Sequence, residues 1–282
     1  QTNCTPYRVW VSEIMLQQTQ VSSVIPFYER FMVELPTLDS LARAEQDKVL
    51  YLWAGLGYYA RARNLHQCAK IICNDHGGQF PDDVATLQTL PGIGRSTAGA
   101  ILSLSMGKRA AILDGNVKRV LCRYHNVRGW PGSSKTGREL WELADRHTPK
   151  ERIPEYTQAI MDLGATCCTR NKPECPRCPI ALTCQANQKG IQHALPERRL
   201  TKTKPKKIRW WAVITRDSAE VLLQRRPSRG LWGGLWVPPE FTIERQATKW
   251  IERRNKSLEK LYKVDPPIFH SFSHFDLEAI QI

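Results

Sequence analysis

Two carboxylates in this sequence have surroundings suited to acid–base chemistry. Glu13 lies in VWVSEIML, between Trp10 and Leu16 on neighbouring turns of an expected helix. Apolar neighbours disfavour the ionised carboxylate, so we expect a raised pKa and an acid that is protonated near neutral pH. Asp114 lies in LDGN, at or just before the N-terminus of another expected helix. Alternatively, Glu13 is a surface glutamate of an amphipathic helix, and Asp114 is an ordinary helix cap.

A short run of cysteines is the second group that can do chemistry. Cys168, Cys175, Cys178 and Cys184 follow the spacing C-x6-C-x2-C-x5-C in CTRNKPECPRCPIALTC. Four thiolates in one loop predict an iron–sulfur cluster or a zinc ion. Zinc ribbons bring two CxxC pairs from separate turns, and this loop has one such pair, which favours a [4Fe-4S] cluster. Cys167 is an alternative first ligand.

The segment 87–119 contains a glycine turn, LPGIG, between two apolar helical patterns. Gly92 and Gly94 permit a tight turn, and Ser96 or Thr97 can open the second helix. The free backbone amides at that helix start would bind a phosphate without regard to sequence. The segment predicts a clamp for the DNA backbone, although glycine turns between helices also occur without this role.

Aromatic and cationic residues alternate in GLGYYARARNLH, residues 55–66. Tyr58 and Tyr59 stand beside glycines and are followed by Arg61 and Arg63. Such a loop can wedge into a base stack while its arginines meet phosphates. Aromatic residues at this density are also ordinary core material.

Composition restricts the function classes. The chain has 282 residues, 41% of them hydrophobic, a net charge of +14 and a pI near 9.5. This excess of positive charge favours a polyanionic partner such as nucleic acid. No apolar run reaches membrane-spanning length, and the nine cysteines fit reduced thiols and one metal site better than disulfides. We therefore expect no membrane association and a cytoplasmic protein, nucleoid-associated if prokaryotic.

The patterning predicts two domains. A helical region is expected over 1–190, a basic linker over 191–209, and a domain with short strands over 210–282 that is incomplete at its end. The expected elements are helical segments at 6–34, broken by the polar run 17–20, two helices within 35–72, further helix at 137–164, strands at 210–215 and 220–224, a helix near 246–253 and one strand-like pattern from 268.

The motifs VWVSEIMLQQTQV, GLGYYARARNLH, LPGIGRSTAGAI and LDGNVKRVL, with the four-cysteine loop, resemble the MutY-type adenine DNA glycosylases in the same order. The resemblance covers nearly the whole chain. It implies a mostly α fold, a helix-hairpin-helix glycosylase with an iron–sulfur cluster loop, plus a C-terminal α/β MutT-like domain. SEIMLQQT and the C-terminal extension separate this family from endonuclease III relatives, which share the other motifs.

The resemblance implies a monomeric enzyme that removes adenine mispaired with 8-oxoguanine or guanine in double-stranded DNA and so begins base excision repair. Glu13 matches the acid that protonates N7 of a flipped adenine, and Asp114 matches the carboxylate that stabilises the oxocarbenium-like sugar. Asn116 matches a residue that orders the site. The expected cofactor is a [4Fe-4S] cluster.

The resemblance also assigns residues that contact DNA. Gln18 and Tyr58 match residues wedged into the base stack, and Thr19 and Leu56 match contacts near the oxidised guanine. Phe272, Ser273 and His274 match the loop that senses 8-oxoguanine. The residues after GLWVPPE lack the acidic run that holds Mg²⁺ in MutT proteins, so we expect recognition without pyrophosphohydrolase activity.

Ser96 separates two reaction types. Bifunctional endonuclease III-type enzymes resemble this chain but carry a lysine there, whose amine forms a Schiff base and cuts the strand. Ser96 has no amine, so the resemblance implies a monofunctional glycosylase. Two alternatives are a glycosylase-lyase for pyrimidine lesions, which Ser96 and Glu13 disfavour, and a non-catalytic DNA-damage binding module, which the two carboxylates disfavour.

Overall fold

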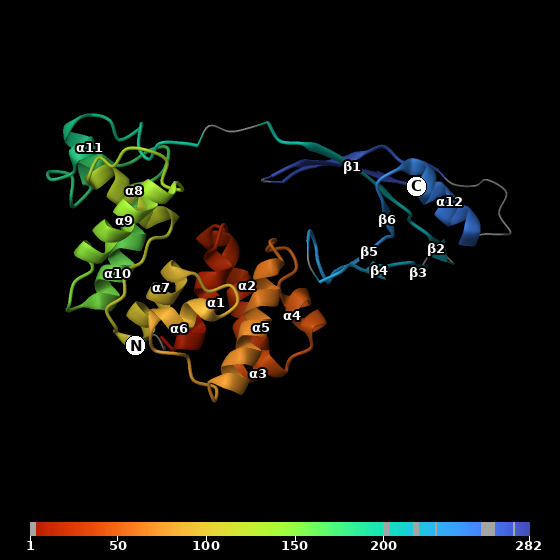
Figure 1. The fold of residues 1–282 in the computed structure, drawn as a ribbon, viewed down its shortest axis with the longest axis horizontal. Coiled ribbons are helices and arrows are strands. Elements are labelled where there is room, and N and C mark those ends of the chain that lie inside the picture. Colours follow the sequence, from red (N-terminus) through yellow and green to blue (C-terminus); the bar gives the residue numbers. More distant parts are fainter. Residues whose placement is uncertain (1–3, 200–202, 217–219, 229, 255–262, 273) are drawn as a thin grey trace. The chain divides into compact units, whose positions relative to one another are not determined.

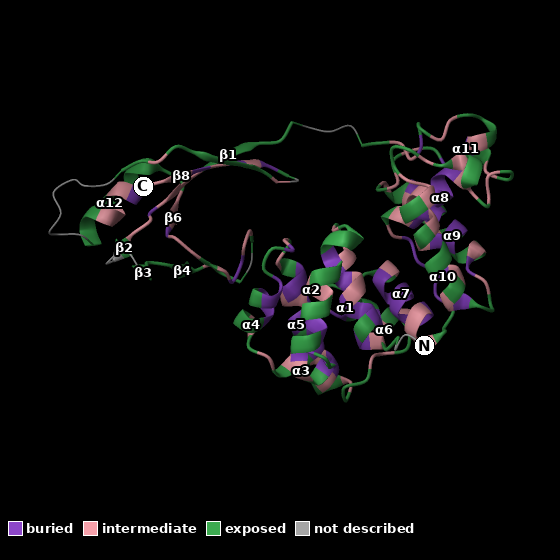
Figure 2. Cartoon of the chain, turned by 180° about the vertical axis from the view of Figure 1, so that it is seen from behind, coloured by how far each residue is buried: buried purple, intermediate pink, exposed green. Residues whose placement is uncertain are grey.

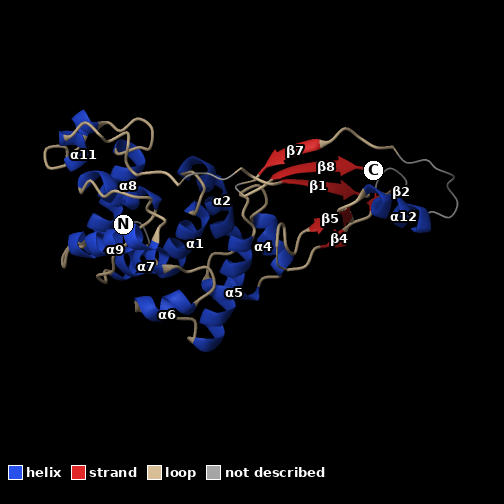
Figure 3. Cartoon of the chain, turned by 45° about the horizontal axis from the view of Figure 1, so that its top comes forward, coloured by secondary structure: helices blue, strands red, loops and turns tan. Residues whose placement is uncertain are grey.

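A computed structural model describes residues 4–199, 203–216, 220–228, 230–254, 263–272 and 274–282 of the chain. The chain divides into two compact units, Gln1–Arg199 and Leu200–Ile282. Figure 1 shows that helices build the first unit. All of the strands drawn in Figure 3 belong to the second unit, so we describe each unit by itself.

The first unit is a succession of helices joined by short turns. Its elements are α1 (Pro6–Leu16), α2 (Val21–Glu34), α3 (Leu38–Arg43), α4 (Gln46–Leu52), α5 (Ala60–Asp75), α6 (Val84–Thr89), α7 (Arg95–Met106), α8 (Gly115–Tyr124), α9 (Ser134–His147), α10 (Ile153–Asp162), the π-helical turn η1 (Leu163–Cys167), the 3-10 turn η2 (Cys175–Arg177) and α11 (Gln185–Gln188).

The break between α1 and α2 falls in the polar run 17–20, as the sequence predicts. The segment 35–72 differs from the prediction of two helices, because it contains α3, α4 and most of α5. Thr37 and Ser40 form a reciprocal capping box that starts α3, and Ala44 ends it with extended backbone angles. These local hydrogen bonds stabilise a short helix that apolar spacing alone does not distinguish from its neighbour.

α7 lies at the centre of the first unit, where it packs against α1, α6 and α10. Its residues 97–103 are all buried, and Figure 2 colours much of α7 as buried. A β-carbon at Gly99 would lie 2.3 Å from the carbonyl oxygen of Ala111. The glycine therefore lets the segment before α8 pass directly against α7.

A second hydrophobic cluster joins α8, α9 and α10. Val117, Val120 and Leu121 of α8 pack with Leu140 of α9 and Ile160 of α10. The apolar spacing of α8 places one face on this cluster and leaves the N-terminal end of the helix free to carry polar residues. None of the helices in the described ranges has the length and hydropathy needed to cross a lipid bilayer.

In its described residues, the second unit has a four-stranded sheet in the order β6-β1-β8-β7, the two-stranded sheets β2-β3 and β4-β5, and the helix α12. Its elements are β1 (Lys206–Trp211), β2 (Thr215–Arg216), β3 (Glu220–Val221), β4 (Gln224–Arg225), β5 (Trp236–Val237), β6 (Glu240–Phe241), α12 (Glu244–Arg254), β7 (Ile268–Ser271) and β8 (Asp276–Gln281). β1 and β8 are parallel, and β7 and β8 form an antiparallel hairpin.

Two expectations for the C-terminal part are wrong in detail. The sequence pattern from 268 predicts one strand, but a turn closed by the Phe272 amide and the Phe275 carbonyl divides it into β7 and β8. β1 starts at Lys206, inside the segment predicted to be a linker. Its lysines pair with β8 through backbone hydrogen bonds, which charge and proline content do not reveal.

Candidate active site and cysteine pocket

Asp114 is the N-cap residue of α8. Its Oδ1 accepts a hydrogen bond from the amide of Val117 at 2.8 Å, and its backbone is extended. Within the described part of the chain, its Oδ2 has no hydrogen-bond partner. The cap therefore fixes the carboxylate at a positive helix end and leaves one oxygen available to another group.

Glu13 of α1 is partly buried and lies within electrostatic reach of Asp114. Burial, and then repulsion by Asp114, raises the pKa of Glu13 from 4.5 to about 7. The cause is the one expected from its neighbours, since Trp10 and Ile14 on the same helix are buried in the core. Glu13 thus keeps a proton at a pH where ordinary carboxylic acids have lost theirs.

The two carboxyl groups have different chemical capacities. A protonated acid beside a fixed carboxylate is the arrangement used to cleave glycosidic bonds, where one group protonates the leaving group and the other stabilises the sugar cation. α1 and α8 are far apart in the chain, and α7, which contacts α1, also packs on the segment that leads to Asp114. The helical core therefore brings Glu13 and Asp114 together.

Asn116 belongs to a network that sequence reasoning missed. Its Oδ1 accepts a hydrogen bond from Arg119 at 2.8 Å, and Arg119 also donates to the carbonyl oxygens of Gly164 and Cys168. A β-carbon at Gly164 would lie 2.6 Å from the Cβ of Asn116, so only glycine fits there. The i, i+3 spacing of Asn116 and Arg119 on α8 could have indicated their contact in the sequence. It does not indicate that Arg119 also binds the carbonyls of Gly164 and Cys168.

The glycine turn joins α6 to α7. Gly92 has a positive φ of 80°, and Gly94 caps α7 without a side-chain hydrogen bond, which leaves the first amides of α7 for a ligand. Ser96 lies in the first turn of α7, and its Oγ accepts the amide hydrogen of Leu113 at 2.9 Å. Ser96 thus holds the backbone directly before Asp114.

Two loops carry the residues expected to contact the base stack. Gln18 and Tyr58 are exposed and have positive φ values of 60° and 49°, while Thr19 is partly buried and Leu56 is buried. The expectation that Arg61 meets phosphates is wrong. The Arg61 side chain is buried and donates hydrogen bonds to protein carbonyls. These include the carbonyl oxygens of Met15, at the end of α1, and Gly57, in the loop before Tyr58.

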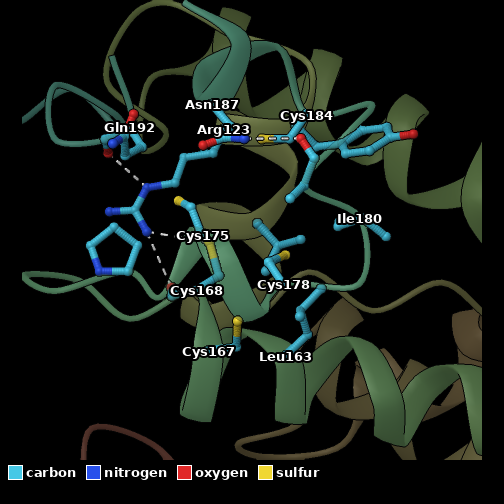
Figure 4. Close-up of a pocket in the computed structure, with 14 residues that line it drawn as sticks. Arg123, Leu163, Cys167, Cys168, Cys175, Cys178, Ile180, Cys184, Asn187 and Gln192 are labelled. Atoms are coloured by element: carbon cyan, nitrogen blue, oxygen red, sulfur yellow. Dashed lines mark hydrogen bonds between the residues drawn. The ribbon is translucent and has the colours of Figure 1, made fainter. Parts of the chain in front are cut away.

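The four predicted cysteine ligands, together with Cys167, line one pocket (Figure 4). The remaining lining is mostly apolar, and Arg123 at its edge donates a hydrogen bond to the Sγ of Cys168 at 3.2 Å. Arg123 is only 2% exposed and also donates to the carbonyl oxygens of Thr169 and Leu195. In the described ranges, no three metal-binding side chains stand close enough together for one ion.

This donor set fits a [4Fe-4S] cluster. Four cysteine thiolates bind such a cluster, and the four predicted cysteines line this mostly apolar pocket. The N–H···S bond from Arg123 would stabilise a thiolate at Cys168.

The loop with Phe272, Ser273 and His274 lies in the second unit. Phe272 packs against Trp232 and Phe275, with ring centroids 5.6 and 4.8 Å apart, and His274 is exposed. Ser273 lies outside the described residues. The hairpin therefore presents the exposed His274 beside an aromatic cluster.

Comparisons with known proteins agree with this arrangement. Residues 11–146 match the HhH-GPD superfamily of base excision DNA repair proteins, and residues 210–282 match the NUDIX domain. The adenine DNA glycosylase of Buchnera aphidicola from Acyrthosiphon pisum is 40% identical over 98% of this chain and 79% of its own. The chain belongs to the adenine DNA glycosylase family. The human member is 35% identical over 96% of this chain and 59% of its own.

Solved structures support the same family fold. A thermostable thymine-DNA glycosylase is 28% identical, with a TM-score of 0.60 over 67% of this chain and 87% of its own. A trapped endonuclease III–DNA intermediate is 22% identical, with a TM-score of 0.58 over 66% of this chain and 86% of its own. The resemblance and the fold class expected from sequence are confirmed. This adenine DNA glycosylase family member is thus a DNA glycosylase, and DNA is its partner.

Proposed function

We propose that this chain hydrolyses the N-glycosidic bond of adenine paired with 8-oxoguanine, or with guanine, in double-stranded DNA. The observation that carries the proposal is Glu13, whose pKa of about 7 is set by burial and by Asp114. The names of the relatives, adenine DNA glycosylases from bacteria to human, supply the base. The opposite base comes from the sequence resemblance, in which Thr19, Leu56 and residues 272–274 contact the oxidised guanine.

The roles of the two carboxylates follow from their surroundings. Protonated Glu13 donates its proton to N7 of an adenine turned out of the duplex, and the C1′–N9 bond breaks with its electron pair going to the base. The free oxygen of Asp114 stabilises the positive charge that develops at C1′. A water molecule then adds to C1′, loses a proton and leaves an abasic sugar.

Further residues of this chain position those groups. Arg119 holds Asn116 against Gly164, which orders the start of α8 beside Asp114. Ser96 supplies no amine for a Schiff base, so the reaction stops at base removal. The backbone amides after Gly94 would bind a DNA phosphate, and Gln18 and Tyr58 would enter the base stack.

The cysteine pocket would hold a [4Fe-4S] cluster on Cys168, Cys175, Cys178 and Cys184. When bound, the cluster supplies a covalent cross-link that closes the cysteine loop. Arg119 and Arg123 of α8 donate to the Cys168 carbonyl, and Arg123 also donates to its sulfur. The chain's own arginines therefore connect the closed loop to the helix that Asp114 caps.

One assay tests the function. The protein is incubated with duplexes that carry adenine opposite 8-oxoguanine, adenine opposite guanine, or an oxidised pyrimidine, each with and without alkaline work-up. We expect adenine loss from the first two substrates and strand breaks only after alkali. Pyrimidine release, or strand breaks without alkali, would favour the glycosylase-lyase alternative; binding without release of any base would favour the non-catalytic module.

A further inference from the structure

Arg61 is a buried arginine that forms no ion pair with any described carboxylate. The residue is 9% exposed, and burial lowers the pKa of its guanidinium to about 10, so it remains a cation at neutral pH. A buried guanidinium is costly unless its donors are satisfied. The Nη1 and Nη2 donors bind acceptors in two separate loops, whereas the buried Nε has no hydrogen-bond partner among the described residues.

One half of the guanidinium binds the end of α1. Nη1 lies 3.0 Å from the carbonyl oxygen of Ile14, 2.7 Å from that of Met15 and 2.6 Å from that of Gln17. The last carbonyls of a helix have no partners within the helix, and a cation there is favourable to the helix dipole. Arg61 therefore fixes how the chain leaves α1 after Leu16, one helical turn beyond Glu13.

The other half binds the neighbouring loop and also Thr19 of the Gln18 loop. Nη2 lies 3.2 Å from the carbonyl oxygen of Gly57 and 3.1 Å from the Oγ1 of Thr19. The guanidinium carbon stands 5.3 Å from the ring centroid of Trp53 and 5.5 Å from that of Tyr58. One planar group thus contacts both loops and one face of an exposed aromatic ring.

The same two loops contain strained backbone. Gln18 and Tyr58 both have positive φ, which is uncommon for residues with a β-carbon, and both side chains are exposed. Such conformations persist only where the surroundings fix them. The carbonyl of Gln17, directly before Gln18, and that of Gly57, directly before Tyr58, are both held by Arg61.

We propose that Arg61 is a positioning residue that joins the Gln18 and Tyr58 loops into one rigid two-pronged wedge, which opens the DNA base stack as a unit. The inference rests on the proposed function in one respect, that these loops meet the stack. A lysine cannot replace Arg61, since its single ammonium lacks the planar fork that reaches both loops.

A purely structural role makes a different prediction. If Arg61 only stabilised the fold, its loss would lower the unfolding temperature and reduce all DNA interactions together. If it joins the two prongs, its loss leaves non-specific, salt-dependent binding in place and removes the opening of the stack. Arg61 and Tyr58 would then also fail to act additively, because each is useless to the wedge without the other.

The experiment uses the full chain and a duplex with 2-aminopurine beside the mismatch, since this base becomes fluorescent when it is unstacked. Arg61→Lys is compared with Arg109→Lys. Arg109 is a matched control because it also donates to two backbone carbonyls, those of Asp145 and Thr148, away from the loops. Tyr58→Ala and the double variant Arg61→Lys/Tyr58→Ala complete a cycle.

We expect Arg61→Lys to lose most of the fluorescence rise. Its single-turnover rate should fall about 10- to 100-fold, because a misplaced substrate reacts more slowly by about this factor. Affinity for undamaged duplex should stay within about twofold, and the double variant should match Tyr58→Ala within about twofold. A wild-type fluorescence rise in Arg61→Lys, or losses that multiply in the double variant, would overturn the wedge.

Two further measurements keep the outcome clear. If Arg61→Lys does not fold, Thr19→Ala removes one acceptor of Arg61 and, on a duplex with adenine opposite guanine, should lower the fluorescence rise in part; an unchanged rise would contradict the proposal. Failure of the wild type to release adenine would refute the proposed function alone, because the fluorescence of bound duplex reports on the wedge without base removal.

Discussion

The carboxyl groups of Glu13 and Asp114 interact electrostatically between α1 and the N-terminus of α8, and this repulsion adds to burial in raising the pKa of Glu13 to about 7. An ionised Asp114 therefore favours a protonated Glu13. Asp114 thus supports the protonated state that Glu13 needs for glycosidic cleavage.

The rate of adenine release should decrease above neutral pH. With a pKa of about 7 for the acid, the single-turnover rate should be level at low pH and fall about tenfold per pH unit well above pH 7. Glu13→Gln should abolish release while mismatch binding survives. Glu29→Gln, at an exposed position of α2, is the matched control. A flat profile across this range would contradict the assignment of Glu13 as the acid.

Glu13→Gln should stabilise the protein at alkaline pH. The folded-state pKa is raised from 4.5 to about 7, so the folded protein binds the additional proton. The stability that protonated Glu13 provides is complete below the unfolded pKa and is lost as pH rises through about 7. At pH 8 the variant should gain up to about 3 kcal/mol, and at pH 4 little. Thermal unfolding across pH measures this; a gain at acidic pH alone would refute it.

Gly164→Ala should slow catalysis by displacing Asn116, not by contacting the substrate. Its β-carbon would lie 2.6 Å from the Cβ of Asn116, so Asn116 must move and its bond with Arg119 is disturbed. We expect a loss of about 10- to 100-fold in single-turnover rate. In Gly137→Ala the nearest atom is 3.7 Å away, the Pro131 carbonyl oxygen, and this variant should retain full activity. Equal rates for both variants would exclude the predicted displacement.

Borohydride should trap no covalent complex between the wild type and DNA, because Ser96 has no amine. Ser96→Lys should give a trapped complex and strand breaks without alkali. Ser105→Lys adds a lysine to the last turn of the same helix and should give neither. Gel electrophoresis after reduction distinguishes them, and efficient trapping of the wild type would overturn the monofunctional assignment.

Iron analysis should distinguish a [4Fe-4S] cluster from zinc. Protein purified without oxygen should hold about four irons and four acid-labile sulfides per chain. Cys184→Ser should lower this content, and Cys73→Ser, a partly buried thiol outside the pocket, should not. Cys167→Ser should keep the cluster if Cys168 is the first ligand. Zinc at one ion per chain, without sulfide, would refute the cluster.

The sequence predicted those features that depend on residues close together in the chain. The polar run after Leu16 ended α1 as expected, and Asp114 is found at the cap of α8. The rise in the Glu13 pKa was predictable because its causes include the apolar neighbours on its own helix. The number of helices within 35–72 was not predictable, because the capping box of α3 interrupts an apolar pattern that is continuous in the sequence.

The roles of the arginines could not be predicted from sequence. Arg61, Arg119 and Arg123 donate mainly to backbone carbonyls contributed by distant segments. Every residue has a carbonyl, so the acceptors carry no compositional signal, and only the folded chain identifies them. The sequence pattern therefore predicted a phosphate contact for Arg61, because arginines bind phosphates in proteins that bind nucleic acid.

The hydrogen bond between the Ser96 hydroxyl and the Leu113 amide restricts how this enzyme could evolve. A change to lysine would introduce the amine of a strand-cutting enzyme and in the same step remove the acceptor that holds the backbone before Asp114. The amide of Leu113 would then need another partner to keep the backbone before Asp114 in place. One hydroxyl therefore connects the type of reaction to the placement of the catalytic carboxylate.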